Sequence, residues 1–316
     1  MTWDSALDLF LTDLLKRGRK PSTVKQYRYD LAIFVSRIQK CSKLPPEDVL
    51  SSFNANVLER YLKVLRKERG ASISNVKRVR GIVINFLQFH GAADSLKSDI
   101  APPKLTSKHF ASDQEIEKLF RFMRSYNGLT EYQASGRKFI MDRNLLLVRF
   151  MLHYGLSIQD IITLSMHDIH FGTNIITPGG LHAYKRSITL SKDDVKLALS
   201  YYKQIPKLIR PRQQTGDPFF VAFDFAPQTF RWDYDKDQPA ALTRIAVQRM
   251  LQKEVKRAEI RVTPTMLRNR FILNALQNGI KPIEIKADLG LKSVEALHRY
   301  TQFWKELQSK ENRIKL

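Results

Sequence analysis

The chain has 316 residues, of which 43% are hydrophobic, so it can bury a sizeable core and wholesale disorder is disfavoured. Its 53 Lys and Arg outnumber its 31 Asp and Glu and give a formal net charge of +22. A field of this size and sign attracts polyanions, and nucleic acid is the commonest polyanion that a protein meets. The alternative at this stage is a basic protein that adheres to ribosomes without specificity. This length favours two domains over one.

Cys41 is the only cysteine, which excludes an intramolecular disulfide and a cysteine-based zinc site. The first 20 residues carry acidic side chains among the apolar ones and do not resemble a signal peptide. No apolar run approaches the roughly 20 residues that a membrane span requires. We therefore expect a cytoplasmic protein without a membrane partner.

Residues 2–90 predict helices only. A helix begins at Pro21 and Ser22, and its apolar positions repeat at spacings of three and four. A second helical segment stops at Gly70, and a third, with three basic residues near its start, stops at Gly91. These segments predict a small helical bundle with one basic flank.

Residues 92–111 contain Ser, two consecutive prolines and three lysines without helical periodicity, which predicts an interdomain linker. A new helix is expected at Ser112, because Glu115 stands three residues later as in a capping box. The net charge is +10 before residue 112 and +12 from there on. Both halves are therefore expected to touch the DNA backbone, as a clamp around the duplex.

The second half predicts a mixed domain. Residues 144–155 form a buried helix, and residues 174–180 and 185–191 two short strands around a Gly-rich turn. The aromatic and acidic segment 217–239 predicts a strand followed by a long loop. The chain then returns to helices.

The order of these pieces resembles the tyrosine recombinases, also called phage integrases. "PSTVKQYRYDLAIF" resembles the opening helix of that family, and "GLSIQDIITLSMHDI", "TPTMLRNRF" and "LGLKSVEALHRYTQF" resemble its three catalytic blocks in the correct order. The resemblance covers nearly the whole chain except the aromatic segment near residues 217–239. It implies a fold that is mainly α with a small β-sheet: a helical core-binding domain (1–91), a linker (92–111) and an α+β catalytic-like domain (112–316).

The family's chemistry implies which residues belong at the site. A tyrosine attacks a phosphodiester, two arginines hold the non-bridging oxygens, and a lysine and histidines move protons. Two of these positions are kept here, as Arg268 and Tyr300, which lie 32 residues apart. Five are replaced: Ser157 for the first arginine, Leu181 for the lysine, Thr265 and Asn269 for histidines, and Leu291 for a histidine or tryptophan.

Removing one oxyanion-stabilising donor costs about 10²–10³ in rate, so losing several together predicts no useful strand cleavage. We therefore expect a pseudoenzyme that binds specific double-stranded DNA and acts as a repressor that controls lysogeny in a prophage of a bacterial host. One alternative is a divergent recombinase using Tyr300, with His182, Lys185 or Arg186 replacing the lysine and Lys292 standing beside Leu291. Another is an architectural factor that assists a different recombinase.

The expected DNA contacts are basic and amide side chains on helices of both halves. They are Lys25, Arg28, Asn75, Lys77, Arg78, Arg80, Arg244, Arg249, Lys253, Arg268 and Lys292. The helix near Ser74 is the first candidate to read bases, and residues 279–302 are a rival as a helix-turn-helix with Gly290 at its turn. For Arg268, pairing with Asp160 is an equal alternative to a phosphate contact.

Three further features concern partners, metals and cofactors. Phe303, Trp304 and Leu307 form one apolar side of a C-terminal helix, which predicts either self-association or packing within the chain. His167 and His170 have a spacing seen in metal sites, but without acidic or thiol ligands beside them we expect no metal. The "PGG" turn lacks the Lys-Ser/Thr of a nucleotide loop, so no cofactor is expected.

Overall fold

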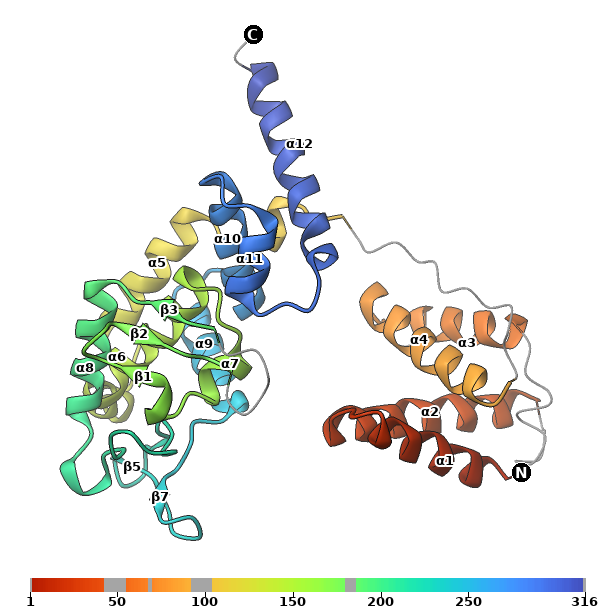
Figure 1. Cartoon of the computed structure of the whole chain (residues 1–316), viewed down its shortest axis with the longest axis horizontal. Coiled ribbons are helices and arrows are strands. Elements are labelled where there is room, and N and C mark those ends of the chain that lie inside the picture. Colours follow the sequence, from red (N-terminus) through yellow and green to blue (C-terminus); the bar gives the residue numbers. More distant parts are fainter. Residues whose placement is uncertain (1, 43–54, 68–69, 92–103, 180–185, 315–316) are drawn as a thin grey trace. The chain divides into compact units, whose positions relative to one another are not determined.

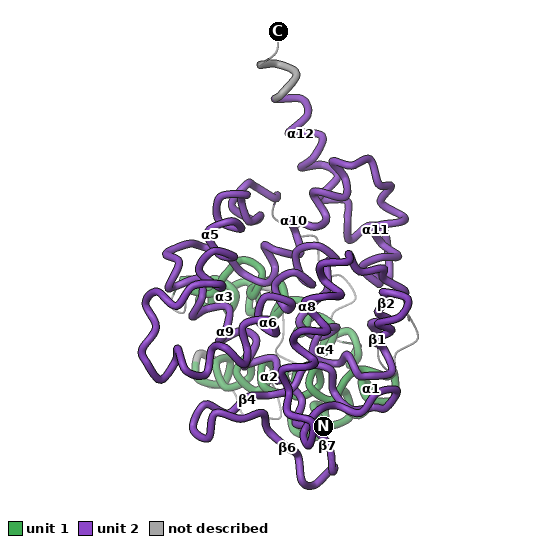
Figure 2. The backbone as a smooth tube through the Cα atoms, turned by 90° about the vertical axis from the view of Figure 1, so that its left-hand side faces the viewer, with its two compact units in different colours: residues 1–102 green, residues 103–316 purple. Residues whose placement is uncertain are grey.

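The computed structural model describes residues 2–42, 55–67, 70–91, 104–179 and 186–314 (Figure 1). The chain divides into two compact units, residues 1–102 and residues 103–316, which Figure 2 colours separately. The described residues are mainly helical with small antiparallel sheets, which confirms the predicted fold class.

Unit 1 consists of helices in its described part: α1 (Trp3–Lys16), α2 (Pro21–Ser42), α3 (Ala55–Lys67) and α4 (Ile73–Phe89). Apolar side chains three and four residues apart give each helix one buried stripe. These stripes meet in one core, which includes Phe10, Leu31, Phe34, Leu58 and Phe86. Gly91 follows α4 at φ 71°, a left-handed conformation that ends the helix as predicted.

Unit 2 is built around the buried helix α6 (Glu131–His153), which packs against α8 (Lys192–Gln204) and α10 (Pro264–Gln277). The other α-helices are α5 (Asp113–Arg124), α7 (Ile158–Ile162), α9 (Arg244–Arg257), α11 (Pro282–Leu289) and α12 (His298–Ile314). Short 3₁₀ helices are η2 (Ser107–His109), η3 (Met166–Asp168), η4 (Lys207–Ile209) and η5 (Val294–Leu297). The predicted capping box forms at the start of α5, where Ser112 and Glu115 exchange hydrogen bonds.

A three-stranded antiparallel sheet joins β1 (Ile169–His170), β2 (Ile175–Ile176) and β3 (Ile188–Thr189) in that order. Ile176 is fully buried and pairs with Ile169 on one side and Ile188 on the other. The two strands expected around the Gly-rich turn are therefore present. The turn itself, residues 180–185, lies outside the described residues.

The aromatic segment differs from the predicted strand and long loop. It forms two hairpins, β4 (Phe223–Asp224) with β5 (Thr229–Phe230), and β6 (Trp232–Asp233) with β7 (Gln238–Pro239). The first turn is closed by Asp224, whose carboxylate accepts a hydrogen bond from the Ala226 amide, and the second contains Asp237 at φ 47°. Strands of two residues are too short to produce a visible alternation in the sequence.

The end of the predicted linker belongs structurally to unit 2, because Leu105, Phe110 and Ala111 are buried there. Phe110 stacks on Phe303 of α12 with ring centroids 4.7 Å apart. Trp304 and Leu307 pack against the same cluster, so the apolar side of the C-terminal helix is covered by this chain itself. The described helices include none with the length and hydropathy of a membrane span.

Candidate functional site

The candidate catalytic centre lies where the end of α6 meets α10 and α11. Gly155 makes this junction possible, because its φ is 63° and an added Cβ would lie 2.5 Å from side-chain atoms of Phe271 and Leu289. The glycine in the "GLS" block therefore serves close packing. The close packing brings the start of α7 near Leu289, the last residue of α11.

Ser157, at the position of the family's first arginine, is the N-cap of α7. Its hydroxyl accepts a hydrogen bond from the Asp160 amide at 3.1 Å, and the Asp160 carboxylate accepts one from the Ser157 amide at 2.8 Å. This reciprocal pair is a capping box. The position therefore serves to start a helix and provides no cation.

A guanidinium nevertheless reaches this place from another segment. Arg186, just before β3, forms an ion pair with Asp160, with 3.1 Å between Nη2 and Oδ2. A Cβ on Gly290 would clash with the same guanidinium, which shows how closely Arg186 approaches the end of α11. The arginine side chain is 12% exposed, and its buried Nε and Nη2 donate no hydrogen bond to the described residues.

Arg268, on α10, points to the same place. Its Nη2 donates to the carbonyl oxygen of Leu289, the last residue of α11, at 3.2 Å. Burial lowers the pKa of Arg268; attraction to Asp160 opposes this shift, and repulsion from Arg186 adds to it. The sequence suggests an ion pair between Arg268 and Asp160 as an alternative. In the structure, Asp160 forms its ion pair with Arg186, and its effect on Arg268 is an attraction without a hydrogen bond.

These contacts place two guanidinium groups around one carboxylate that is already engaged in a capping box. Like charges that lie close together and are poorly solvated favour the binding of an anion. The unused donors of Arg186 add to this tendency, because buried donors without an acceptor are costly. The arrangement suits one phosphate group.

Tyr300 is held by a buried bridge. Its hydroxyl donates to Asn269 Oδ1 at 2.7 Å, while Asn269 Nδ2 donates to the His109 carbonyl oxygen at 2.8 Å. Asn269 is 3% exposed, and the Tyr300 ring packs edge-on against Phe110. The amide that replaces the family's histidine therefore ties α10, η2 and α12 together, and it cannot act as a general base.

The other replaced positions provide no acid or base among the described residues. Thr265 is exposed in the first turn of α10, and Leu291 packs against the apolar cluster under α11. Leu181, His182 and Lys185 lie outside the described residues. Arg186 is the rescue candidate before β3 that lies within the described residues, and it reaches the site.

The candidate DNA contacts of unit 1 are partly engaged with carboxylates. Arg78 forms an ion pair with the buried Asp30, and this hydrogen bond raises the arginine's pKa. Arg80 pairs with Glu59 at 3.7 Å and Arg28 with Asp8 at 2.7 Å. The contacts of Arg78 show a structural role that sequence reasoning missed, because Asp30 is 48 residues away.

The remaining unit 1 candidates lie on α2 and α4. Lys25 is exposed, and Asn75 accepts hydrogen bonds from Arg78 through its side-chain oxygen. The helix that is the first candidate to read bases, α4, begins at Ile73 with Ser72 as its N-cap, slightly before the predicted start. Lys77 lies one turn further along it, half-buried.

In unit 2 the candidates on α9 are exposed. Arg244, in the first turn, donates to Gln159 of α7 at 3.0 Å, which links α9 to the capping-box helix. Arg249 and Lys253 are exposed further along the helix, as is Lys292 after α11.

The rival helix-turn-helix is not formed as expected. Gly290 does adopt the left-handed conformation at the end of α11, with φ 61°. The expected recognition helix, however, is divided between η5 and the first turn of α12. His167 and His170 are both exposed, and no cluster of metal-ligand side chains occurs within the described ranges.

The chain consists of a helical unit and a second unit that carries Arg268, the helix capped by Ser157, and Tyr300 near its C-terminal end. This combination is typical of the tyrosine recombinase fold. The sequence model of the phage integrase family matches residues 112–306, and the chain belongs to this family.

The chain is similar to curated tyrosine recombinases. The chain is 24% identical over 303 residues to tyrosine recombinase XerD of Listeria innocua, covering 95% of this chain and 94% of the relative. It is 25% identical over 300 residues to tyrosine recombinase XerA of Pyrococcus furiosus, covering 94% and 88%.

Two solved structures share the fold. The XerH site-specific recombinase bound to palindromic difH substrate, in a post-cleavage complex, has a TM-score of 0.67 at 17% identity, covering 94% of this chain and 81% of that one. The Tn1549 transposon integrase in complex with circular intermediate DNA has a TM-score of 0.63 at 17% identity, covering 95% of each chain.

Proposed function

We propose that this chain binds specific sequences in duplex DNA without cutting them and acts as a transcriptional repressor of a phage or prophage in a bacterial host. The observation that carries the proposal is the capping box at Ser157. The position that should hold a phosphate-clamping arginine is used to start α7, through hydrogen bonds of 2.8 and 3.1 Å.

The state of the tyrosine supports the loss of cleavage. The Tyr300 hydroxyl donates to an amide oxygen, and Asn269 and Leu291 offer no group that could take up or deliver a proton. An attack on phosphorus would break the bridge to Asn269 without a base to help. The expected result is binding without turnover.

Retained DNA binding is supported by charge and by the two guanidinium groups. A net charge of +22 provides non-specific affinity for the phosphate backbone. Arg186 and Arg268 hold one phosphate and thereby fix the register of the protein on the duplex. The similar solved structures named above are complexes with DNA, which is consistent with this use of the fold.

Repression follows from long occupancy of a promoter by a protein that does not turn over. The test is a map of the DNA that crosslinks to this chain in its native host. Sharp peaks that share one motif at several promoters are expected. A single peak at an attachment-like site would favour recombination or an architectural role, and binding without any sequence preference would refute the proposal.

The position of Arg186 favours a second candidate, a divergent recombinase. A guanidinium supplied from the β3 side would replace the arginine that is absent at 157, so that two cations again face the phosphate. This candidate requires a covalent bond between Tyr300 and DNA. Trapping on a nicked duplex that carries the mapped motif distinguishes the two functions.

A further inference from the structure

Unit 2 contains a cavity of about 1060 Å³ between α6, α9 and the hairpins of the aromatic segment. Binding pockets for small molecules commonly have volumes of roughly 300–1,000 Å³, so the space fits a nucleotide-sized ligand. Its walls carry eight basic side chains against three acidic ones, Asp233, Glu254 and Glu259. It lies apart from the Arg268–Tyr300 site, whose residues do not line it.

One wall of the cavity is formed by the aromatic segment, residues 217–239. Phe223 and Phe225 come from the first hairpin, and Arg231 lies between the two hairpins. The rings of Phe223 and Phe225 approach α6 closely because position 136 is glycine: a Cβ there would lie 2.9 Å from the Phe225 ring and 3.3 Å from the Phe223 ring. This packing fixes the two aromatic rings over the cavity wall.

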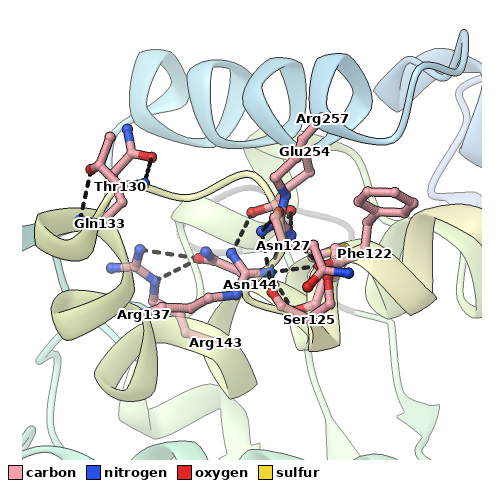
Figure 3. A network of polar contacts seen from close by, with 11 residues as sticks. Phe122, Ser125, Asn127, Thr130, Gln133, Arg137, Arg143, Asn144, Glu254 and Arg257 are labelled. Carbon is pink, nitrogen blue, oxygen red and sulfur yellow. Dashed lines mark hydrogen bonds and ion pairs between the residues drawn. The ribbon is translucent and has the colours of Figure 1, made fainter.

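One of the three carboxylates is fully used by structural contacts. Figure 3 shows Arg137 and Arg257 converging on Glu254, with ion-pair distances of 2.9 and 2.6 Å. The same arginines donate to carbonyl oxygens at the end of α5, including that of Phe122. This network therefore joins α5, α6 and α9, and it leaves no negative charge to spare for the cavity.

Arg143 contributes a positive charge to the cavity that is not paired with a carboxylate of the described residues. Its side chain is buried, and within the described residues its donors reach only neutral acceptors, the side-chain oxygen of Asn144 (Figure 3) and the carbonyl oxygen of Val221. Burial lowers the pKa of Arg143 to about 10, so the group stays charged at neutral pH. A buried cation is costly unless an anion accompanies it.

Further cations surround the opening. Arg231, Arg249, Lys253 and Lys256 are exposed, and none of them forms an ion pair with a carboxylate of the described residues. Asp233 is already paired with Lys236 at 3.2 Å. The cavity thus combines the buried charge of Arg143, which no carboxylate of the described residues neutralises, with exposed cations at its rim and with the rings of Phe223 and Phe225 in its wall.

We propose that this cavity binds a phosphorylated small molecule of nucleotide size, with its phosphates between Arg143 and the rim cations and its organic part against Phe223 and Phe225. The rim cations are the reason to propose an anionic ligand over a purely apolar one. A phosphate of bound DNA has the same chemistry, so the experiment must separate the two sources.

The test is calorimetric titration of the full chain, free of DNA, with ADP and with inorganic pyrophosphate. Saturable binding of ADP is expected, weakened about tenfold or more in Arg143→Met and in the double variant Arg231→Ala/Lys256→Ala, since each change removes a charge-assisted contact. Arg121→Ala/Lys207→Ala removes the same charges from exposed positions outside the cavity and should leave binding unchanged.

If Arg143→Met fails to fold, the double variant carries the comparison, because both of its sites are exposed. If neither ADP nor pyrophosphate shows saturable binding, the proposal is wrong. If the double variant then also weakens duplex binding, the rim cations serve the DNA backbone instead. The proposed DNA-binding function does not depend on either result.

Discussion

Arg186→Ala is expected to weaken duplex binding without unfolding the protein. The guanidinium is 12% exposed and lies against Asp160, and its Nε and Nη2 donate to no acceptor among the described residues. A phosphate placed there would receive charge-assisted hydrogen bonds, for which about 1.5–3 kcal/mol is typical. The substitution should therefore lower affinity by about 10- to 100-fold.

The loss should be similar for specific and random duplexes, because a phosphate contact carries no direct sequence information. Anisotropy titrations at several salt concentrations measure this directly. Removing one phosphate contact reduces the slope of log K against log salt by about 0.9. Folding should be preserved, because Asp160 keeps its hydrogen bond from the Ser157 amide.

Arg121→Ala is the matched control, since Arg121 is an exposed arginine of unit 2 whose one ion pair among the described residues is with its helix neighbour Glu117. It should change the affinity and the salt slope much less. If Arg186→Ala leaves both quantities at their wild-type values, Arg186 does not hold a phosphate, and the assignment of the two-guanidinium site is wrong.

Three further outcomes are expected. Asn269→Ala should lower the free energy of unfolding by about 2–4 kcal/mol, because it leaves Tyr300 and a backbone carbonyl without their partner; denaturant titration measures this, and a loss below about 0.5 kcal/mol would contradict the bridge. Ser157→Arg should destabilise the protein by about 0.5–2 kcal/mol through loss of the N-cap and should not restore cleavage of a nicked duplex, whereas cleavage by this variant would show that a single missing cation accounts for inactivity. Burial alone would raise the pKa of Asp194, but hydrogen bonds from Arg149, Tyr154 and Ser191 outweigh it and lower the pKa, so this carboxylate contributes stability above the ordinary value of about 4 that is lost as pH falls through its folded pKa. Asp194→Asn should therefore flatten the acid limb of the unfolding profile, and an unchanged acid limb would contradict this.

Local features of the fold could be predicted from the sequence. The helix that starts at Pro21, the capping box of Ser112 and the helix end at Gly91 each depend on residues within one or two turns. The hairpins of the aromatic segment could not be predicted, because each strand has only two residues. Their position depends on contacts with Gly136, far back in the chain.

The residues of the site were predictable only where they belong to local sequence blocks. Reading the family blocks locates Ser157, Arg268 and Tyr300, but the arrival of Arg186 beside Asp160 depends on the folding of the sheet and has no signal in local spacing. The bridge through Asn269 was missed for the same reason, since its partner His109 lies 160 residues away. A signal was available in retrospect: an amide is a natural replacement where a buried position must both donate and accept hydrogen bonds.

The proposed loss of strand cleavage is tested most directly by covalent trapping on a nicked duplex that carries the motif found in the native host. Wild-type protein and Tyr300→Phe should both bind this duplex, and neither should form a complex that survives denaturation. A covalent adduct formed by the wild-type protein and absent from Tyr300→Phe would contradict the proposal. It would show that the chain still cleaves a DNA strand through Tyr300.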